Sequence, residues 1–408
     1  MTFEELYREV LKQTLKPDGK PLPEHEAGHL DCLLYPEKYP PVLRTESCEK
    51  CEYDQACEKS CVFDAIVPGP DGKLVIDPDL CTGCGACIEA CHSDKLTASR
   101  DILPALKAVR DKGKLAYALV APAFLGQFSE DVTPGKLRNA FKALGFDGMV
   151  EVALFADILT LKEALEFDRN ILHDGDYQLT SCCCPVWIAM IRKIYRDLMP
   201  HVPGAVSPMI ACGRVIKKLH PEAVTVFIGP CIAKKSEARE PDLAGAVDYV
   251  LTFQEIRDVF EAADIDPGVL PESEKDHSSR AGRIYAHTGG VSEAVKSTVE
   301  QLNPRRNIAV RTRQADGVPA CRAMIQQLEN GEIDGNFFEG MGCVGGCVGG
   351  PKAILNREEG RRHVEAYGDD AAYYTPLENP YVIELLHRLG FDTVEELLHK
   401  SDIFTRDF

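Results

Sequence analysis

The sequence has few basic residues, few aromatic residues and no long apolar run. Lysine and arginine total 46 against 64 acidic side chains, giving a formal net charge of -18, and tryptophan occurs once. An acidic surface repels phosphate groups, so we expect no nucleic-acid partner. No apolar run is long enough to span a bilayer, and Met1 to Leu6 contain neither the basic nor the apolar part of a signal peptide. We therefore expect a cytoplasmic chain that does not enter membranes.

Cysteine, in contrast, is abundant, with 17 among 408 residues. This length suggests two or three domains, and 45% hydrophobic with 27% charged residues indicates globular folding rather than disorder. Because cytoplasmic thiols are kept reduced, metal ligation or redox chemistry is the leading explanation for so many cysteines. All but three are clustered. The isolated ones, which we expect to be ordinary buried thiols, are Cys32, Cys212 and Cys321.

Residues 1–47 are predicted to form an N-terminal arm that begins with a helix over residues 3–15 and continues as a Pro-rich stretch. His25, His29 and Cys32 have a spacing that could bind a metal on one helical face. Gly28 and the flanking prolines argue against a regular helix there. We therefore expect no metal site in the arm.

The segment 48–105 has the pattern of a duplicated iron-sulfur module. Its second half, from Cys81 to Cys91, has the C-x2-C-x2-C-x3-C spacing of a 4Fe-4S ferredoxin, and its first half has a longer central spacer. Zinc, which paired C-x2-C motifs also bind, is the less favoured alternative. The fourth cysteine of each run ordinarily ligates the other cluster. This rule assigns one cluster to Cys48, Cys51, Cys57 and Cys91, and the other to Cys81, Cys84, Cys87 and Cys61.

From residue 112 onwards, apolar segments alternate with helical patterns, which predicts an α/β domain over residues 112–375. Ligands bind where parallel strands end, so the loops after the strands are the expected site. Residues 376–408 are predicted to complete this domain with two small helices joined at Gly390. The expected strands are 115–120, 149–154, 224–228 and 284–287, and the expected helices are 136–144 and 162–171.

Three separated loops in this domain carry the remaining clustered cysteines. Their sequences are TSCCCPVW at 180–187, PCIAKKSE at 230–237 and EGMGCVGGCVGG at 339–350. The spacing alone indicates only that the loops can converge on an iron-sulfur cluster. Their residues resemble the three signature motifs of the di-iron (FeFe) hydrogenases, and the resemblance extends over residues 48–405. It implies two open α/β sheets around an active-site cluster, preceded by a small α+β domain of the bacterial 2x4Fe-4S ferredoxin type.

The resemblance implies an active-site cluster, called the H-cluster, in which a 4Fe-4S cubane is joined to a di-iron unit with carbon monoxide, cyanide and a bridging dithiolate. Lys234 would hold a cyanide by a charge-assisted hydrogen bond, and Met341 would lie beside the di-iron unit. The implied cubane ligands are Cys184, Cys231, Cys343 and Cys347, of which the last bridges to the di-iron unit. The other positions implied to contact the cofactor are Ala121, Pro122 and Tyr285.

The first motif has one cysteine more than the family pattern, as in a non-prototypical subgroup often called group B. Anchoring the motif on Pro185 and Trp187 makes Cys183 the implied proton-donating cysteine. Anchoring it on Thr180 shifts the assignment by one residue, which leaves Cys182 as the alternative. The spacing of the glutamates before the motif and of a Ser-Pro pair after it favours the proline anchor.

Glu163 and Glu166 precede the motif at the distance of the family's relay glutamates, three residues apart on one helix face. Without the resemblance, such a pair would be interpreted as a solvated helix face, and Lys234 with Lys235 as a surface pair. A serine that completes the relay in the family is replaced by Pro203, so water would have to bridge the gap. The other departures from the family pattern are Gly229, Ala123 and Pro351.

The resemblance thus implies an oxidoreductase that interconverts H2 with protons and electrons. Its implied partners are H2 and protons, a ferredoxin or similar soluble electron carrier, and dedicated di-iron maturation proteins. Two other functions stay open, namely an iron-sulfur assembly or carrier protein of the same fold and a hydrogen sensor that acts through a separate partner. A carrier would not be expected to keep Cys183, Lys234, Met341 and the glycines after Cys347 together, and this chain has them all.

Overall fold

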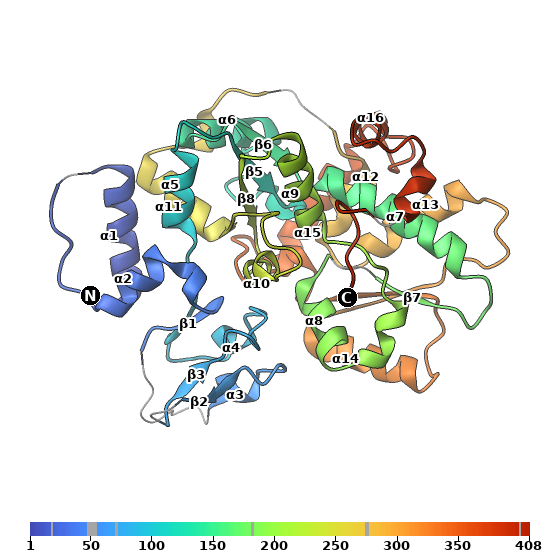
Figure 1. The fold of residues 1–408 in the computed structure, drawn as a ribbon, viewed down its shortest axis with the longest axis horizontal. Helices are drawn as coiled ribbons and strands as arrows, with labels where there is room; N and C mark the ends of the chain where they lie inside the picture. Colours follow the sequence, from blue (N-terminus) through green and yellow to red (C-terminus); the bar gives the residue numbers. More distant parts are fainter. Residues whose placement is uncertain (18, 47–54, 70–71, 181–182, 274–276, 400) are drawn as a thin grey trace.

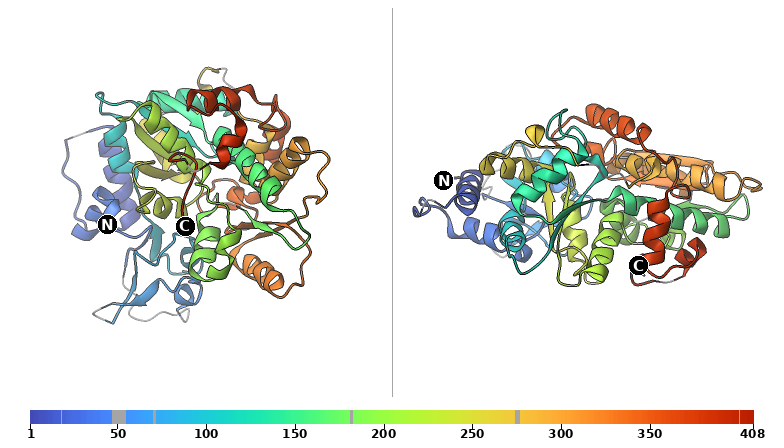
Figure 2. Two further views of the ribbon diagram at one scale, coloured as in Figure 1. Left: turned by 45° about the vertical axis from the view of Figure 1, so that its right-hand side comes forward. Right: turned by 90° about the horizontal axis from the view of Figure 1, so that it is seen from above.

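The computed structural model describes the chain from residue 1 to residue 408, except residues 18, 47–54, 70–71, 181–182, 274–276 and 400. The expectations for Cys48, Cys51 and Cys182 therefore lie outside the described residues. Figures 1 and 2 show the N-terminal helices and the cysteine-rich segment at one end of the molecule and helix α13 (Gly290–Leu302) at the other. The two parallel sheets lie between them.

The N-terminal segment contains two helices that pack against parts of the chain distant in sequence. Helix α1 (Phe3–Leu15) is confirmed as predicted, and Thr2 and Glu5 form a capping box at its start. It packs on α11 (Phe253–Ala263). The prediction of no regular helix around Gly28 was wrong, because α2 spans Ala27–Leu34 and Gly28 lies in its first turn, where the cost of glycine is small. The His29 ring donates from Nε2 to the Thr45 carbonyl at 2.9 Å.

In its described residues, the cysteine-rich segment contains two small antiparallel sheets and two one-turn helices (Figure 1). Strand β1 pairs with β4, and β2 pairs with β3. The two halves have matching backbone conformations. A residue with positive φ, Gln55 or Gly85, precedes each short helix. A second residue with positive φ, Asp64 or Asp94, lies three positions after the fourth cysteine of each half. The elements are β1 (Val42–Arg44), α3 (Ala56–Lys59), β2 (Ile66–Pro68), β3 (Leu74–Ile76), α4 (Ala86–Glu89) and β4 (Leu96–Ala98).

Two parallel sheets form the larger part of the molecule. The four-stranded sheet has the order β6-β5-β8-β9 and the three-stranded sheet the order β10-β11-β7. Because the strands of each sheet are parallel, their carboxyl ends share one edge, as expected for a ligand site. The strands are β5 (Ala116–Val120), β6 (Gly148–Glu151), β7 (Gln178–Leu179), β8 (Val224–Gly229), β9 (Tyr249–Thr252), β10 (Thr312–Asp316) and β11 (Phe337–Met341).

Helices cover both sheets, and α7 (Ala153–Asn170) is buried along most of its length. It contacts α9, α12, α13 and α16. The remaining helices are α5 (Ile102–Val109), α6 (Pro134–Leu144), α8 (Pro185–Lys193), α9 (Pro208–Leu219), α10 (Ala233–Arg239), α12 (Arg280–Arg283), α14 (Val318–Glu329), α15 (Arg357–Asp369) and α16 (Pro380–Arg388). The single-turn 3-10 helices η2 (Pro122–Phe124), η5 (Ile284–Ala286) and η6 (Cys347–Gly349) lie in loops, and η7 (Val394–Leu398) follows α16.

Three element predictions differ from the structure. Residues 284–287 form no strand, because α12 continues into η5, and Gly290 lies so close to Ile284 that a Cβ there would meet its carbonyl oxygen at 1.8 Å. The strand predicted at 149–154 ends at Glu151, and the helix predicted at 162–171 already begins at Ala153. The two C-terminal helices are as predicted, with Gly390 at φ +90° between them.

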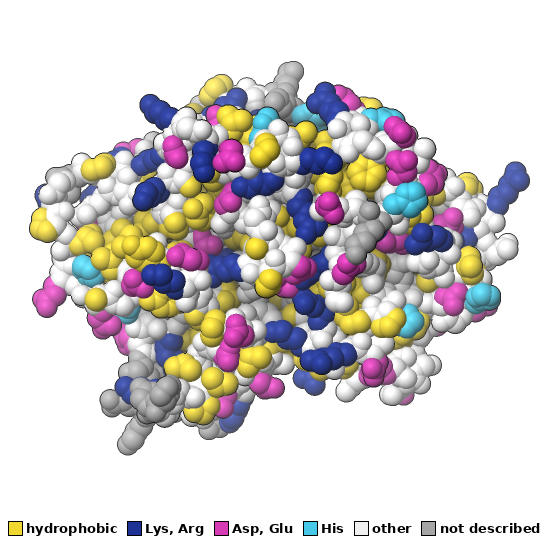
Figure 3. All heavy atoms as spheres, in the orientation of Figure 1, with side chains coloured by type: hydrophobic (Ala, Val, Ile, Leu, Met, Phe, Trp, Pro, Cys, Tyr) yellow, Lys and Arg dark blue, Asp and Glu magenta, His cyan; other side chains and the backbone are white. Residues whose placement is uncertain are grey.

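The face of the molecule drawn in Figure 3 carries charged side chains of both signs. On the face shown in Figure 3, lysine and arginine side chains are interspersed with acidic ones. Within the described part of the chain, no helix is both long enough and apolar enough to cross a membrane.

Candidate functional site

The three cysteine loops of the α/β domain converge at the carboxyl edges of the two sheets. Cys184 caps α8, Cys231 lies between β8 and α10, and Cys343 and Cys347 follow β11. The Gly342 backbone N–H donates to Cys184 Sγ at 3.2 Å. The structure therefore brings together the four cysteines that the sequence selected as cubane ligands.

The charge environment of these thiols fits a metal cluster. Burial, followed by the charges of neighbouring cysteine sulfurs, raises the pKa of Cys231 to about 11 and that of Cys347 to about 12. The pKa of Cys343 is raised well above its ordinary value by burial and by the charges of Cys231, Cys184 and Cys347. Each of the four residues keeps part of its surface accessible. A cation stabilises crowded thiolates, so the donor set fits an iron-sulfur cluster.

Close backbone approach explains two glycines of the third loop. A Cβ at Gly340 would lie 2.1 Å from the Trp187 ring, and one at Gly346 would lie 2.7 Å from the Thr288 backbone nitrogen. Gly346 also has φ +84°, a conformation that other residues rarely adopt. The only tryptophan therefore packs in the core, directly against the strand that carries the motif.

Glu339, which sequence reasoning did not single out, fixes the start of this loop. Its buried carboxylate accepts the backbone N–H groups of Gly289 and Ser292, each at 2.8 Å, at the N-terminus of α13. Burial nevertheless raises its pKa. The first letter of the motif is thus a structural anchor between β11 and α13.

Lys234 is buried beside the cysteines. Burial acts to lower its pKa, but Glu237, whose carboxylate lies 2.6 Å from Nζ, outweighs burial, and the pKa is raised. The charges of Cys231 and Cys183 also act on it. The two lysines do not form a surface pair, since Lys235 is fully buried and donates to the Val250 carbonyl at 2.6 Å.

Cys183 lies between the four thiols and the predicted relay. Burial raises its pKa well above the ordinary value, followed by the charges of Cys184, Cys347, Glu163 and Glu339 in that order. The structure therefore brings Cys183 close to both the candidate cluster ligands and the first relay glutamate.

The glutamate pair does not form a solvated helix face. Glu163 is 0% and Glu166 8% exposed on α7. Glu166 forms a buried ion pair with Lys162 and lines a cavity of about 440 Å³ together with His201 and Pro203. Pro203, which stands where the resemblance implies a serine, therefore lines the same cavity as Glu166.

The remaining predicted contact positions surround the same place. Met341 and Tyr285 belong to a buried apolar cluster against which Cys183 and Cys184 pack. The Tyr285 hydroxyl lies 2.8 Å from Thr160 Oγ1, and Glu163 and Cys183 are among the charges that act on it. Ala121 and Pro122 form the turn after β5, next to Gly229, where a Cβ would lie 3.0 Å from the Ala121 methyl group.

The isolated cysteines were only partly predicted. Cys212 and Cys321 are buried, but Cys32 is partly exposed. Cys321 is less ordinary than expected, because its thiol donates to the Met341 carbonyl at 3.3 Å and lies close enough to Cys184 to be influenced by its charge. Nothing in the local sequence pointed to this contact.

In the ferredoxin-like segment, the structure brings together Cys61, Cys81, Cys84 and Cys87, which the spacing rule assigns to one of the two clusters. Burial raises the pKa of Cys81 to about 11 and that of Cys87 to about 12, with further contributions from Cys84 and Cys61. The same four residues line a cavity of about 20 Å³. Cys57 and Cys91, assigned to the other cluster, pack against the same small apolar cluster.

The two cysteine regions are in direct contact. A Cβ at Gly83 would lie 3.1 Å from Ala233 Cα, next to the Cys231 loop, and one at Gly85 would lie 3.3 Å from Pro351 Cβ. Ser236 also donates to the Cys81 carbonyl at 3.3 Å, and the charge of Cys84 reaches Cys343. The ferredoxin-like cysteines thus adjoin the buried set.

Comparisons with known families agree with this arrangement. Residues 114–351 match the family described as iron only hydrogenase large subunit, C-terminal domain, and residues 74–91 match the 4Fe-4S binding domain.

Three curated relatives show the range of proteins to which the chain is similar. The NADP-reducing hydrogenase subunit HndD of Solidesulfovibrio fructosivorans is 26% identical over 398 residues, covering 83% of this chain and 68% of that protein. Iron hydrogenase 1 of Clostridium pasteurianum is 28% identical, covering 57% and 47%. The cytosolic Fe-S cluster assembly factor NAR1 of Yarrowia lipolytica is 26% identical, covering 48% and 45%.

Solved structures show the same fold. A variant of the FeFe-hydrogenase HydA1 from Chlamydomonas reinhardtii has a TM-score of 0.62 at 23% identity, covering 76% of this chain and 98% of that chain. A HydA structure that reveals stepwise assembly of the H-cluster has a TM-score of 0.63 at 22% identity, with the same coverage. At this identity the likeness shows the fold alone.

Proposed function

Because this chain belongs to the iron-only hydrogenase family, we propose that it catalyses the reversible oxidation of H2 to protons and electrons. The observation that carries this proposal is the convergence of Cys184, Cys231, Cys343 and Cys347 with Lys234 and Cys183 beside them. The cysteines would hold an H-cluster, which supplies the redox centre at which H2 is interconverted with two protons and two electrons. We further propose that the extra cysteine makes this chain a member of a group B-like subgroup.

The chain's own residues would orient the cofactor. Lys234 is positively charged and buried, so it can donate a charge-assisted hydrogen bond to an anionic ligand such as cyanide. Met341, Tyr285, Ala121 and Pro122 would exclude water from the same side. Glu237 keeps the Lys234 ammonium group in place.

Protons would leave through Cys183 and the two glutamates. The Cys183 thiol would exchange a proton with the active site and pass it to Glu163. From Glu163 the proton path would continue along α7 to Glu166. Water in the cavity beside Glu166 and Pro203 would take the place of the usual serine. Cys182 remains the alternative donor.

Electrons would pass between the buried cysteine set and the ferredoxin-like segment. The charge of Cys84 at Cys343 and the close packing at Gly83 support this route. We propose two 4Fe-4S clusters, held by Cys48, Cys51, Cys57 and Cys91 and by Cys61, Cys81, Cys84 and Cys87, with a ferredoxin or similar soluble carrier as partner. The di-iron unit would come from maturation proteins.

An iron-sulfur assembly or carrier function is the second candidate, because the chain is also similar to the NAR1 assembly factors. Such a protein needs the four cysteines but has no use for a proton donor beside them. The presence of Cys183, buried Lys234 and Met341 around one site favours the hydrogenase. A sensor acting through a partner would need the same cofactor and differs from the enzyme only in turnover.

Infrared spectroscopy of anaerobically purified protein, produced with and without the maturation proteins, tests the proposal. We expect bands of iron-bound carbonyl and cyanide only with maturation, a shift of these bands under H2, and H2-dependent reduction of a redox dye. Cys231→Ser should lose the bands, and Cys212→Ala, which removes a buried thiol outside the site, should keep them. Complete iron-sulfur clusters without such bands would favour the carrier, and bands without turnover would favour the sensor.

A further inference from the structure

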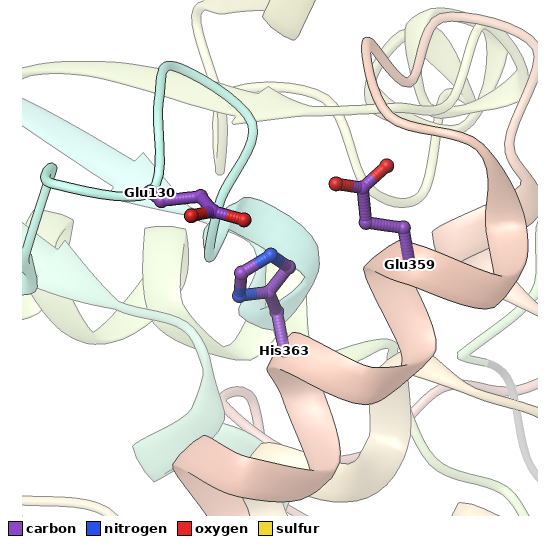
Figure 4. Close-up of side chains that lie close together, drawn as sticks. All are labelled: Glu130, Glu359 and His363. Atoms are coloured by element: carbon purple, nitrogen blue, oxygen red, sulfur yellow. The ribbon is translucent and has the colours of Figure 1, made fainter.

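A second group of metal-binding side chains occurs in the catalytic domain and contains no cysteine. Glu130 comes from the loop between η2 and α6, and Glu359 and His363 come from successive turns of α15. One donor atom of each lies within 4.8 Å of those of the other two. In Figure 4 the imidazole lies between the two carboxylates, so the three side chains face one common space.

The surroundings hold the three side chains in this arrangement. Gly126, at φ +73°, lets the loop pass so close to α15 that a Cβ there would lie 2.8 Å from His363 Nε2. Gln127 Oε1 accepts the backbone N–H groups of Ile354 and Leu355, which fixes the loop just before α15. The loop that carries Glu130 is therefore attached to the helix that carries the other two donors.

His363 supplies an observation independent of the carboxylates. Its Nε2 is buried, and within the described part of the chain it has no hydrogen-bond partner. A buried imidazole nitrogen ordinarily has a partner, so this one requires an explanation. Glu359, in contrast, is oriented by Asn356, whose Nδ2 donates to Oε2 at 3.1 Å, as the carboxylate ligands of metals commonly are.

We propose that Glu130, Glu359 and His363 bind one divalent first-row transition-metal ion. Two carboxylates and one neutral imidazole match the donor preferences of Mn²⁺, Fe²⁺ and Zn²⁺, and the ion neutralises the two negative charges. Metal–ligand bonds of about 2.0–2.2 Å place two ligand atoms on opposite sides of the ion about 4.4 Å apart at most. The three donor atoms lie within 4.8 Å of one another, so a small movement of the exposed Glu130 side chain brings all three within bonding distance of one ion. Water completes the coordination.

The ion would brace the catalytic loops. Helix α15 packs on η6, which contains Cys347, and on η5, which contains Tyr285. A Cβ at Gly360 of α15 would lie 3.2 Å from Val348 Cβ. Fastening Glu130 to α15 therefore connects the loop after η2 to the helix behind the third cysteine loop. The ion would be structural, and the proposal does not depend on hydrogenase activity.

Mn²⁺ is the probe that tests this site, because thiolates bind it weakly and cysteine sites compete little. The full chain with its iron-sulfur clusters, freed of loosely bound metal, is titrated with Mn²⁺ while electron paramagnetic resonance follows the free ion. We expect one bound Mn²⁺ and a rise in melting temperature. Glu130→Gln and His363→Gln should bind at least about tenfold more weakly and show no such rise.

Glu358→Gln is the matched control, because Glu358 is an exposed glutamate in the same turn of α15 and outside the group. It should bind as the unaltered chain does. Glu130 is exposed, so its substitution tests binding even if the His363 variant fails to fold. Absence of Mn²⁺ binding at millimolar concentration, or equal binding by Glu130→Gln, would overturn the proposal.

Discussion

The cysteines gather in two regions that are built in different ways. In the ferredoxin-like segment they are close in sequence, and only small two-stranded sheets and a small apolar cluster surround them. In the α/β domain they come from three distant loops, positioned by two parallel sheets and a large core. The first region has little apolar surface to bury, so we expect its shape to depend on bound iron-sulfur clusters. The second has a scaffold of sheets and helices, which should hold its donors in place even without a cluster.

Removal of iron should produce the largest difference between the two regions, which we expect in the protection of their backbone amides from exchange. Metal binding contributes on the order of 10 kcal/mol to the folding of small metal-dependent domains. After anaerobic chelation we expect the amides of β2, β3, α3 and α4 to exchange like those of an unfolded chain, while those of β5 and β8 stay protected. Hydrogen exchange with mass spectrometry measures both. Equal loss of protection in the two regions would show that the distinction is wrong.

Cys183→Ala should affect chemistry without affecting structure. Loss of a general acid-base group lowers turnover by about 10²- to 10⁴-fold. The fold should persist, because the scaffold positions the neighbouring ligands. H2-dependent dye reduction measures activity, and infrared spectroscopy measures cofactor content. Cys212→Ala is the control, and activity close to that of the unaltered chain in Cys183→Ala would transfer the role to Cys182.

Gly340→Ala should damage the scaffold itself. The added methyl group would lie 2.1 Å from the Trp187 ring, and overpacking of this kind costs about 3 kcal/mol. We expect a clearly lower melting temperature by circular dichroism. At Gly175, a Cβ would meet nothing within 4 Å, so Gly175→Ala should change little. Similar melting temperatures for both variants would show that β11 tolerates displacement.

Asp157 should make the stability of the α/β domain depend on pH. Its carboxyl accepts hydrogen bonds from Ser279, Gly282 and Asn379, but burial outweighs them and raises its pKa to about 6. Because the folded-state pKa lies above the unfolded value, the protonated carboxyl stabilises the folded state fully below about pH 4, and this contribution, roughly 3 kcal/mol, is lost as the pH rises through about 6.

The melting temperature of the unaltered chain and of Asp157→Asn, measured from pH 5 to pH 8, isolates this contribution. The unaltered chain should lose stability relative to the variant as the pH rises. A difference that is constant with pH would contradict the assignment. The ferredoxin-like segment contains none of the hydrogen-bond partners of Asp157, so its amide protection should not follow this pH dependence.

The sequence predicted the donor atoms better than the scaffold. Metal ligands appear as local patterns, so Cys231, Cys343 and Cys347 could be selected from short motifs. Whether a helix is buried depends on what packs around it, and the burial of Glu163 and of Lys235 could not be inferred from their neighbours in sequence. The residues alone would therefore have favoured a solvated helix face and a surface pair, neither of which the structure contains.

Element boundaries show the same limit. The apolar residues at 284–287 suit a strand as well as a tight helical turn, and the tertiary contact at Gly290 decides in favour of the turn. Likewise, the apolar residues after Glu151 continue the strand pattern, although α7 begins there. Periodicity cannot resolve such short segments.

The contact between the Gly83 loop and Ala233 has a consequence for engineering. A ferredoxin-like unit joined only by a linker could be exchanged for another electron-transfer protein. The segment in this chain, however, packs against the α/β domain at two glycines, Gly83 and Gly85. A transplanted module, or a photosensitiser attached in its place, would need the same small residues at both positions to restore the contact. The ferredoxin-like segment is therefore complementary in shape to the α/β domain, and another electron-transfer module cannot replace it without a matching surface.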